Sequence, residues 1–190
     1  PADISREAVQ AGAVLFLEGY LFDRDEAKAA FKVASKYAHE AGRKVSLTLS
    51  DSFCVDRHRE DFLDLILNDI DVLFCNEFEL QSLYQTSYEE ALEQLRNDCE
   101  FGAVTRDKRG SVVINGHDLV HIEPEPVDWV VDATGAGDQY AAGFLYGFTR
   151  GMAIEHCGRL GSMSASEVIT HVGPRPLVQL STLIPEHLRS

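Results

Sequence analysis

The segment 132–138, Asp-Ala-Thr-Gly-Ala-Gly-Asp, places the strongest constraint on how this chain can fold. The β-rich run 127–131 precedes it, and the run 139–147, rich in small residues and typical of a helix, follows it. This order predicts a strand, a glycine-rich turn and a helix. The unpaired N–H groups at the start of such a helix favour an anion in the turn, and glycine lets the backbone approach a phosphate closely. The sequence therefore predicts a phosphate-binding turn.

Asp138 is predicted to lie in the first turn of that helix. If the bound anion is a transferable phosphoryl group, its carboxylate can take a proton from an attacking hydroxyl. Aspartate is also common near helix N-termini because the helix dipole favours it there, and Gly-Ala-Gly alone is a weak signal. The complete Asp-x-x-Gly-Ala-Gly-Asp string between a strand and a helix favours the catalytic interpretation.

This string, with the small-residue helix behind it, resembles the C-terminal signature of the ribokinase-like (PfkB) carbohydrate and nucleoside kinases. The resemblance implies that Asp138 is the catalytic base and that the backbone amides of Gly135, Ala136 and Gly137 form the anion hole. It also implies a three-layer α/β/α fold, and ATP and Mg²⁺ as cofactors in transfer of the γ-phosphoryl group to a hydroxyl of a sugar or nucleoside.

The length and charge of the chain bound its function. With 190 residues it can form a proper core, and we expect residues 1–190 to be a single α/β domain. The net charge of −14, from 17 basic and 31 acidic residues, argues against nucleic acid or an anionic membrane as a partner. A phosphate-handling enzyme can still be acidic overall, because its anion site is local.

Cysteine spacing and hydropathy bear on location. The four cysteines, Cys54, Cys75, Cys99 and Cys157, form no C-x-x-C pair and indicate neither a zinc site nor a disulfide framework. A reducing, cytoplasmic location is the simplest interpretation. The apolar run 11–17 is too short to span a membrane and lacks the basic flank of a signal peptide.

The first half of the chain alternates between predicted strands and helices. Continuous apolar runs of the kind found in parallel sheets precede segments with helical periodicity, which gives the order β-α-β-α-β. The expected strands are 13–17, 45–49 and 72–75, and the expected helices are 24–41 and 56–68, the second capped by Asp56. Glu18 follows the first strand and is either an active-site carboxylate or a plain loop residue.

Asn76 and Glu79 lie three residues apart just after the third strand, so they share a helical face. An asparagine N-cap with glutamate three residues later is close to a capping box. The resemblance implies a second role, because an N-x-x-E motif in this place influences Mg²⁺ and phosphate binding in the family. One residue pair can serve either purpose, and the downstream Asp138 motif favours the metal interpretation, with Mg²⁺ held through water.

The loop 105–110 follows a further predicted strand, 101–105. The family often places a threonine, a glycine two residues on and another glycine beside the ATP phosphates, and Thr105 and Gly110 fit this pattern. Asp107 stands where the first glycine is usual, which puts direct backbone contact there in doubt. Asn115-Gly116 then predicts a hairpin turn, so we expect an antiparallel hairpin at the edge of a mainly parallel sheet.

A second helix, 153–169, is predicted to pack closely against the motif helix through small residues. In the family this helix pair borders the adenine pocket, and Gly173 falls in the loop that closes it. That loop supplies carbonyls to a monovalent cation in some members. Asp132 and Thr134 match the other ligands of those members, which makes K⁺ a possible cofactor and adds Thr134 to the residues expected beside the nucleotide.

The resemblance covers only the later part of the family's fold. No counterpart of the sugar-binding glycine pair, the substrate-binding aspartate or the small β-sheet lid is recognisable, so we expect the N-terminal substrate and lid part to be missing. Many relatives pair through the lid, which leaves a homodimer open. The loops 17–21 and 50–57 look most like the adenosine-kinase-like branch.

Two other functions compete with a kinase. The chain can be a catalytically inactive ATP-binding module or fragment, which the missing sugar site favours and the intact base and anion hole oppose. A dinucleotide-binding oxidoreductase is disfavoured, because the glycine turn lies near the C-terminus and no G-x-G-x-x-G follows an early strand.

Overall fold

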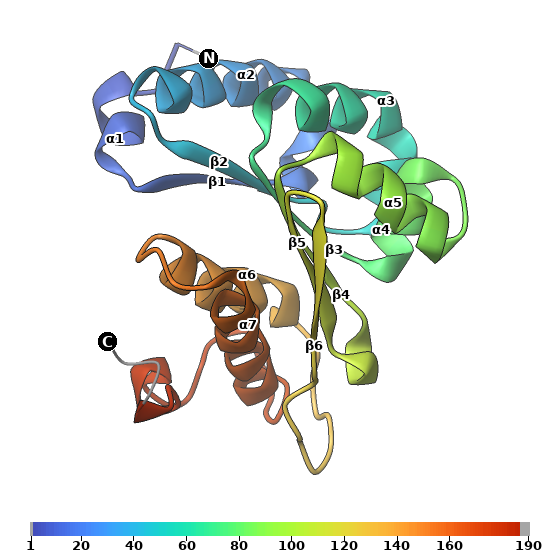
Figure 1. The fold of residues 1–190 in the computed structure, drawn as a ribbon. Helices are drawn as coiled ribbons and strands as arrows, with labels where there is room; N and C mark the ends of the chain where they lie inside the picture. The colour runs from blue at the N-terminus through green and yellow to red at the C-terminus, as the bar shows by residue number, and fades with distance from the viewer. Residues whose placement is uncertain (1, 187–190) are drawn as a thin grey trace. The chain divides into compact units, whose positions relative to one another are not determined.

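The computed structural model describes residues 2–186 of the chain (Figure 1). The helices are α1 (Arg6–Ala11), α2 (Asp25–Glu40), α3 (Ser52–Asp69), α4 (Glu77–Tyr84), α5 (Tyr88–Asp98), α6 (Ala136–Phe148) and α7 (Ile154–Val168). The strands are β1 (Val14–Glu18), β2 (Lys44–Thr48), β3 (Val72–Asn76), β4 (Phe101–Thr105), β5 (Ser111–Asn115) and β6 (Asp118–Ile122). Short 3-10 helices cover Gly19–Asp23, Asp107–Arg109 and Leu180–Thr182.

The strands form one six-stranded sheet in the order β1-β2-β3-β4-β5-β6. β1, β2 and β3 run parallel, with Val14 opposite Lys44 and Ser46 opposite Val72. β4 to β6 form the antiparallel edge. This arrangement confirms the predicted mainly parallel sheet with an antiparallel edge hairpin.

The chain divides into two compact units. The first unit comprises Pro1–Val104 with Ile114–Asp118, and the second comprises Thr105–Val113 with Leu119–Ser190. The single domain expected over residues 1–190 therefore stays a prediction. No helix among residues 2–186 combines the length and the apolar character needed to cross a bilayer.

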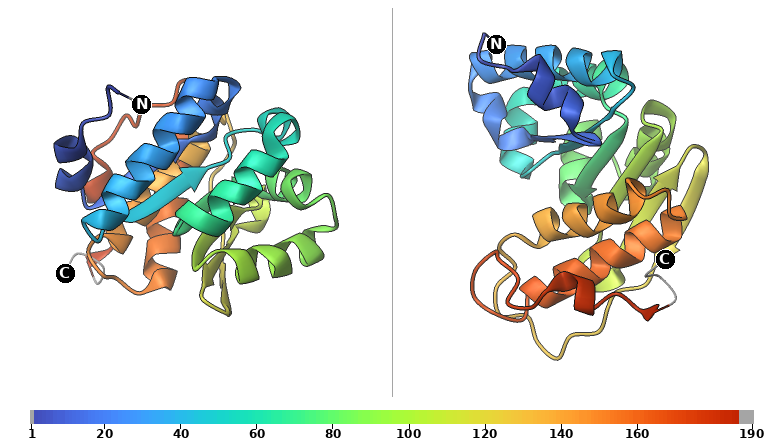
Figure 2. Two further views of the ribbon diagram at one scale, coloured as in Figure 1. Left: turned by 90° about the horizontal axis from the view of Figure 1, so that it is seen from above. Right: turned by 90° about the vertical axis from the view of Figure 1, so that its left-hand side faces the viewer.

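The first unit packs its helices against the parallel strands. α2 lies on β1 and β2, α3 contacts α2 and α4, and α4 contacts β3 and α5. α2 and α3 lie side by side along β2 in the left view of Figure 2. The rings of Phe22 and Phe62 stack with centroids 4.3 Å apart, so the segment after β1 is fixed to α3 by aromatic packing.

β1 is less buried than its apolar sequence predicts. Leu17 is buried, whereas Val14, Leu15 and Phe16 are only partly covered. A strand inside a parallel sheet buries both faces, but β1 stands at the end of the strand order and, among the described strands, pairs with β2 alone. Glu18 at its end is exposed.

α3 begins four residues before the predicted start, so the assignment of Asp56 as its cap is wrong. The cap is Asp51, whose carboxylate accepts a hydrogen bond of 2.8 Å from the Cys54 amide. His58 has non-helical backbone angles, φ −125° and ψ 25°, and kinks the helix there.

The predicted strand 127–131 is absent from the described residues, and this segment is irregular, with bends at Asp128 and Val131. The amides of Val131 and Asp132 both donate to the carbonyl of Ile169, at the end of α7. The preceding Pro124 and Pro126 carry no N–H to donate to a neighbouring strand. The segment therefore packs against a helix end instead of joining the sheet.

All four cysteine thiols are free and buried. Burial raises the pKa of Cys99 to about 12 and that of Cys157 to about 11. It also raises the pKa of Cys54 and Cys75. These thiols are therefore protonated and shielded in the folded chain.

The second unit is built on the close packing of α6 against α7. A Cβ on Gly143 would overlap the Leu160 carbonyl oxygen and lie 2.5 Å from Ser164 Oγ. A Cβ on Gly161 would lie 2.9 Å from the Tyr140 carbonyl oxygen. Glycine at both positions lets the two backbones approach, which confirms the predicted packing through small residues.

We predict that Gly143→Ala destabilises the chain by about 1–3 kcal/mol, because overpacking forces α6 and α7 apart. Gly137→Ala is the matched control, since a Cβ there would meet no atom within 4 Å. Urea unfolding of both variants measures the difference. Equal stability of the two variants would contradict the packing argument.

Candidate phosphate and nucleotide site

The glycine turn at the start of α6 has the predicted form. Gly135 is the N-cap of α6, with φ +79° in the left-handed region and no side-chain cap. A Cβ at this position would lie 2.5 Å from Pro174 Cβ. Both the backbone angle and the lack of space therefore require glycine here.

The first turn of α6 has an open face. The Ala136 amide donates to the Ala133 carbonyl at 3.1 Å, whereas the amides of Gly137 and Asp138 stand at helix positions that have no intrahelical acceptor. Gly137 and Asp138 are exposed, and within residues 2–186 the Asp138 carboxylate has no hydrogen-bond or salt-bridge partner. The turn thus presents amides and a free carboxylate side by side.

Asp132 ties this turn to the loop after α7. Its Oδ1 accepts from the Thr134 amide and its Oδ2 from the Gly173 amide, each at 2.9 Å. Hydrogen bonds from the Thr134 hydroxyl, then from the amides of Gly173 and Thr134, lower the pKa of Asp132 to about 2. Three of the residues predicted near the nucleotide or cation are therefore brought together by one carboxylate.

We predict that Asp132→Asn lowers the stability at neutral pH and that this loss shrinks in acid. An unfolded aspartate has a pKa of about 3.9, above the folded value of about 2. The ionised Asp132 carboxylate therefore contributes its full share to the free energy of unfolding above about pH 4. This contribution is lost as the pH falls through the folded pKa. Thermal unfolding of wild type and Asp132→Asn from pH 7 to pH 3 measures this difference in stability. Asp128→Asn is the control, because Asp128 is exposed. A difference from wild type that does not change with pH would contradict the assignment.

A cavity of about 240 Å³ lies within the second unit, between the β4–β5 loop, the segment before α6, and the helices α6 and α7. Thr105 and Gly110, predicted to contact ATP, line it together with Ala136 and Gly137 of the turn. Thr134 and Gly173 are not among its lining residues. The structure thus brings two of the four predicted nucleotide residues to the cavity and holds the other two at Asp132.

Two residues of the β4–β5 loop have the left-handed backbone angles that favour glycine. Asp107 has φ +53° and Gly110 has φ +76°, and the Arg106 amide donates to the Gly110 carbonyl at 2.8 Å. A left-handed conformation normally selects glycine, and aspartate is one of the few other residues that tolerate it. Asp107 therefore keeps the backbone of the loop at the position where glycine is usual, and it lines the cavity with Lys108.

Asn76 and Glu79 form the capping box that the sequence allowed. Asn76 Oδ1 accepts from the Glu79 amide, and Glu79 Oε2 accepts from the Asn76 amide, both at 2.9 Å. Glu79 Oε1 also accepts from Asn76 Nδ2 at 2.7 Å. Only 6% of Glu79 is exposed, and this burial raises the pKa of its carboxyl to about 7, against the opposing hydrogen bond from Asn76.

We predict that Glu79→Gln flattens the pH dependence of stability. The pKa of the Glu79 carboxyl is about 7 in the folded chain, above the ordinary 4.5. Its contribution to the free energy of unfolding is therefore complete below about pH 4.5 and is lost as the pH rises through 7. The wild-type free energy of unfolding should fall by about 2–3 kcal/mol more than that of the variant between pH 5 and pH 8.

Urea midpoints at the two pH values provide this measurement. Glu90→Gln is the control, because hydrogen bonds to Thr86 and Ser87 lower the pKa of Glu90 and its effect is constant over this range. Parallel pH profiles for wild type and Glu79→Gln would show that the Glu79 carboxyl does not titrate there.

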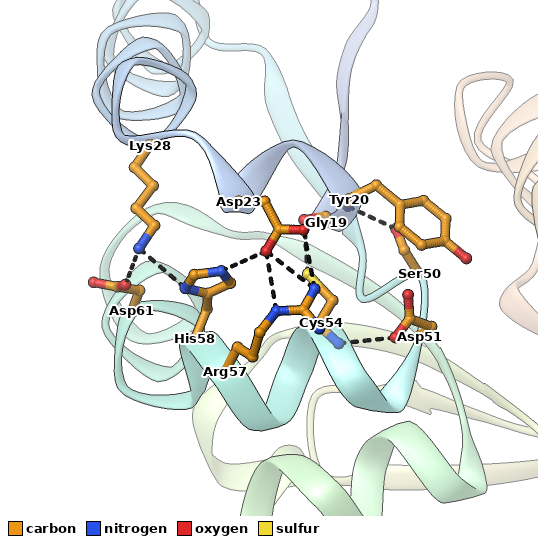
Figure 3. A network of polar contacts seen from close by, with 10 residues as sticks. All are labelled: Gly19, Tyr20, Asp23, Lys28, Ser50, Asp51, Cys54, Arg57, His58 and Asp61. Atoms are coloured by element: carbon orange, nitrogen blue, oxygen red, sulfur yellow. Dashed lines mark hydrogen bonds and ion pairs between the residues drawn. The ribbon is translucent and has the colours of Figure 1, made fainter.

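Figure 3 shows a polar network after β1 that residue patterns did not indicate. Arg57 donates to Asp23 at 3.0 and 3.1 Å, and His58 Nε2 lies 2.8 Å from Asp23. Lys28 Nζ lies 3.2 Å from His58 Nδ1 and 2.5 Å from Asp61. Because an ammonium group only donates, Nδ1 accepts and Nε2 carries the proton. Hydrogen bonds from His58, then Arg57, lower the pKa of Asp23.

Two further groups in the second unit were also missed. The hydroxyls of Ser111 on β5 and Tyr140 on α6 form a buried hydrogen bond of 2.7 Å, and Tyr140 lines the cavity. Ser162 on α7 lines it too. No local pattern could mark these residues, since serine and tyrosine are common in helices and strands and their partners lie far away in sequence.

Known proteins with similar sequences are sugar and nucleoside kinases. A model of the pfkB family carbohydrate kinases matches residues 1–180. The cytidine kinase of Thermococcus kodakarensis is 33% identical over 141 residues, which cover 70% of this chain and 49% of the relative. A sugar kinase of Archaeoglobus fulgidus described as uncharacterised is 36% identical over 114 residues, covering 60% and 45%.

Two solved structures are similar over most of the chain. The adenosine kinase from Sinorhizobium meliloti superposes with a TM-score of 0.93 at 45% identity, covering 96% of this chain and 57% of that one. A probable sugar kinase from Rhizobium etli CFN 42 gives a TM-score of 0.94 at 45% identity, covering 96% and 56%. The chain spans about half the length of the curated relatives it matches.

These similarities place the three-layer α/β fold in the ribokinase-like class. The chain belongs to the pfkB family of carbohydrate kinases, which confirms the resemblance drawn from the segment 132–138.

Proposed function

We propose that the chain forms the ATP-binding and catalytic part of a kinase that transfers the γ-phosphoryl group of ATP to a hydroxyl of a sugar or nucleoside. The observation that supports this most is the first turn of α6, where Ala136 and Gly137 line a cavity and the next residue, Asp138, is exposed. Family membership agrees with it.

In this mechanism Asp138 accepts the proton of the attacking hydroxyl. Its exposed carboxylate has no competing partner among the described residues, so it is ready to accept a proton. The amides of Gly135, Ala136 and Gly137 stabilise charge on the transferred group, the kind of preorganised electrostatics that usually contributes most. Because the Ala136 amide is already bonded to Ala133, Gly137 carries the more open donor.

The residues present fit Mg²⁺ only through water. Both oxygens of Glu79 are engaged by Asn76, and among residues 2–186 no group of three or more His, Cys, Asp or Glu side chains could hold a metal ion. We propose that Asn76 and Glu79 orient water around Mg²⁺, which when bound neutralises charge on the phosphates.

A monovalent cation such as K⁺ is a further part of the proposal. Asp132 stays ionised at neutral pH because its pKa is about 2, and Thr134 is fixed beside it. Carbonyls of the loop at Gly173 would complete the oxygen ligands. The Asp132 carboxylate already orders this loop, so a cation here would reinforce an existing arrangement.

Both a nucleoside and a sugar remain candidate acceptors. The Sinorhizobium meliloti protein is named an adenosine kinase and the Rhizobium etli protein a probable sugar kinase, and both are 45% identical to this chain. The cytidine kinase of Thermococcus kodakarensis adds weight to a nucleoside. We therefore propose an adenosine-kinase-like acceptor first and a sugar second.

The second candidate function is an ATP-binding module without activity. The observation that favours it is length, since the chain spans only about half of its curated relatives. Such a module would bind ATP and release no ADP with any acceptor.

We predict that Asp138→Asn keeps ATP binding and lowers turnover about 100- to 10,000-fold, because the general base is lost. ADP release from Mg·ATP is measured with adenosine, cytidine, ribose and fructose. Binding is followed by the fluorescence of Trp129, the only tryptophan in the sequence, which lies between the cavity-lining Val127 and Val130.

Asp118→Asn is the matched control, since Asp118 is exposed and outside the cavity lining. Near-normal turnover of Asp138→Asn would contradict its role as the base. Binding of ATP by wild type without ADP release would support the module instead.

A further inference from the structure

The ring of His58 is held on both of its nitrogens by residues of two other elements (Figure 3). Its Nε2 lies 2.8 Å from Asp23 Oδ1, in the segment after β1, and its Nδ1 lies 3.2 Å from Lys28 Nζ on α2. Lys28 also bonds Asp61, one turn further along α3. Only 19% of the His58 side chain is exposed, so these partners largely take the place of water around the ring.

His58 is also the residue at which α3 bends, since its backbone angles are non-helical. Sharp kinks in helices are nearly always caused by proline, by glycine and serine, or by a group that disrupts the hydrogen-bond ladder. The segment 55–61 contains none of these three residue types. The contacts that hold the His58 ring to Asp23 and Lys28 remain as the cause of the bend, so the position of the ring and the shape of α3 are linked.

The segment Gly19–Asp23, between β1 and α2, is fixed to the first half of α3 at both of its ends. Asp23 accepts from Arg57 Nε and Nη2 at 3.1 and 3.0 Å. At the other end, Cys54 Sγ donates to the Gly19 carbonyl at 3.2 Å, and a Cβ on Gly19 would lie 2.6 Å from the Leu49 carbonyl oxygen. The segment and the first half of α3 therefore form one assembly.

This assembly lies at the carboxyl ends of β1 and β2. Glu18 ends β1 directly before the segment Gly19–Asp23, and it stands opposite Thr48, the last residue of β2. The Tyr20 amide donates to Ser50 Oγ at 3.2 Å, and Ser50 has φ +73°, a left-handed angle that is uncommon outside glycine. Strained residues of this kind gather at ligand-binding sites, and ligands of open α/β sheets bind outside the carboxyl ends of the strands. The assembly is therefore at the place expected for a ligand of the first unit.

The phosphate turn and the 240 Å³ cavity belong to the second unit, whereas Asp23, Lys28 and His58 belong to the first. We propose that His58 is a positioning residue for the acceptor: it holds the bend of α3, and with it the segment Gly19–Asp23, in the form that binds a sugar or nucleoside. His58 acts through its two partners and does not touch the acceptor, since both ring nitrogens are engaged. The inference rests on the proposed function, because only a kinase of this kind has such an acceptor.

The test compares His58→Leu, which removes both ring contacts, with Asp64→Asn. Asp64 is the matched control, because its exposed ion pair with Lys32 also joins α3 to α2 but does not involve the segment Gly19–Asp23. ADP release from Mg·ATP is followed at increasing adenosine, cytidine or ribose, and tryptophan fluorescence gives the ATP affinity. His58→Gln, whose amide can still donate to Asp23, is the conservative variant, and circular dichroism checks that each variant folds.

We expect His58→Leu to raise the KM for the acceptor about three- to tenfold, the effect of losing one hydrogen bond that holds the segment. Its kcat and its ATP affinity should stay within about twofold of wild type, because only uniform binding of the acceptor is lost. His58→Gln should raise the KM less, and Asp64→Asn should leave it unchanged. Asp23→Asn should raise the KM as His58→Leu does, and combining the two should add little, since both act through one contact.

An unchanged acceptor KM in His58→Leu or, where that variant does not fold, in Asp23→Asn would overturn the inference alone. So would a matching loss of ATP affinity, which a general loss of stability would produce, or an equal rise of the KM in Asp64→Asn. Additive effects of His58→Leu and Asp23→Asn would also overturn it. If the wild-type chain releases no ADP with any acceptor, the proposed function fails first and the inference fails with it.

Discussion

The second unit depends on the approach of two helix backbones. Gly143 and Gly161 leave no room for a Cβ between α6 and α7, so the helices are held at a distance that larger residues would not allow. This contact fixes the start of α6, where Gly135 packs on Pro174 and Asp138 faces outward. It also fixes the face of α7 that lines the cavity. Glycine at positions 143 and 161 thus positions the phosphate turn, the candidate base and the wall of the cavity.

The parts of the structure that could be predicted from sequence are those governed by local rules. Helical periodicity predicted α2 to within a residue at each end, whereas α6 begins three residues before the small-residue run 139–147. The pair Asn76–Glu79 marked the start of α4, and Asn115-Gly116 marked the hairpin turn. The start of α3 could not be placed, because Asp51 and Asp56 are both plausible caps and the kink at His58 is set by tertiary contacts. The run 127–131 has strand-like composition, yet its amides bond to Ile169 at a helix end, which no local pattern reveals. The network around Asp23 joins residues some 30 positions apart, and sequence spacing carries no signal for it.

Several residues serve folding and the proposed chemistry at once. Asn76 and Glu79 cap α4, and the same hydrogen bonds orient the carboxylate that would meet water around Mg²⁺. Asp132 orders the loop at Gly173, and its low pKa keeps the charge that a monovalent cation would need. A stability measurement and an activity measurement on these variants would therefore change together, whereas the Asp138 side chain makes no bond that the described fold requires. Substitutions of Asp138 are therefore better suited to changing function without changing stability.

The buried thiols make the chain a reporter of its own opening. Cys54, Cys75 and Cys99 lie in the first unit and Cys157 in the second, and burial keeps each of them protonated. An alkylating reagent can modify a thiol only during the moments when its surroundings come apart. The four labelling rates would therefore record how often each unit opens, without an introduced probe. The unlabelled fraction after a short pulse would show whether the two units open together or independently.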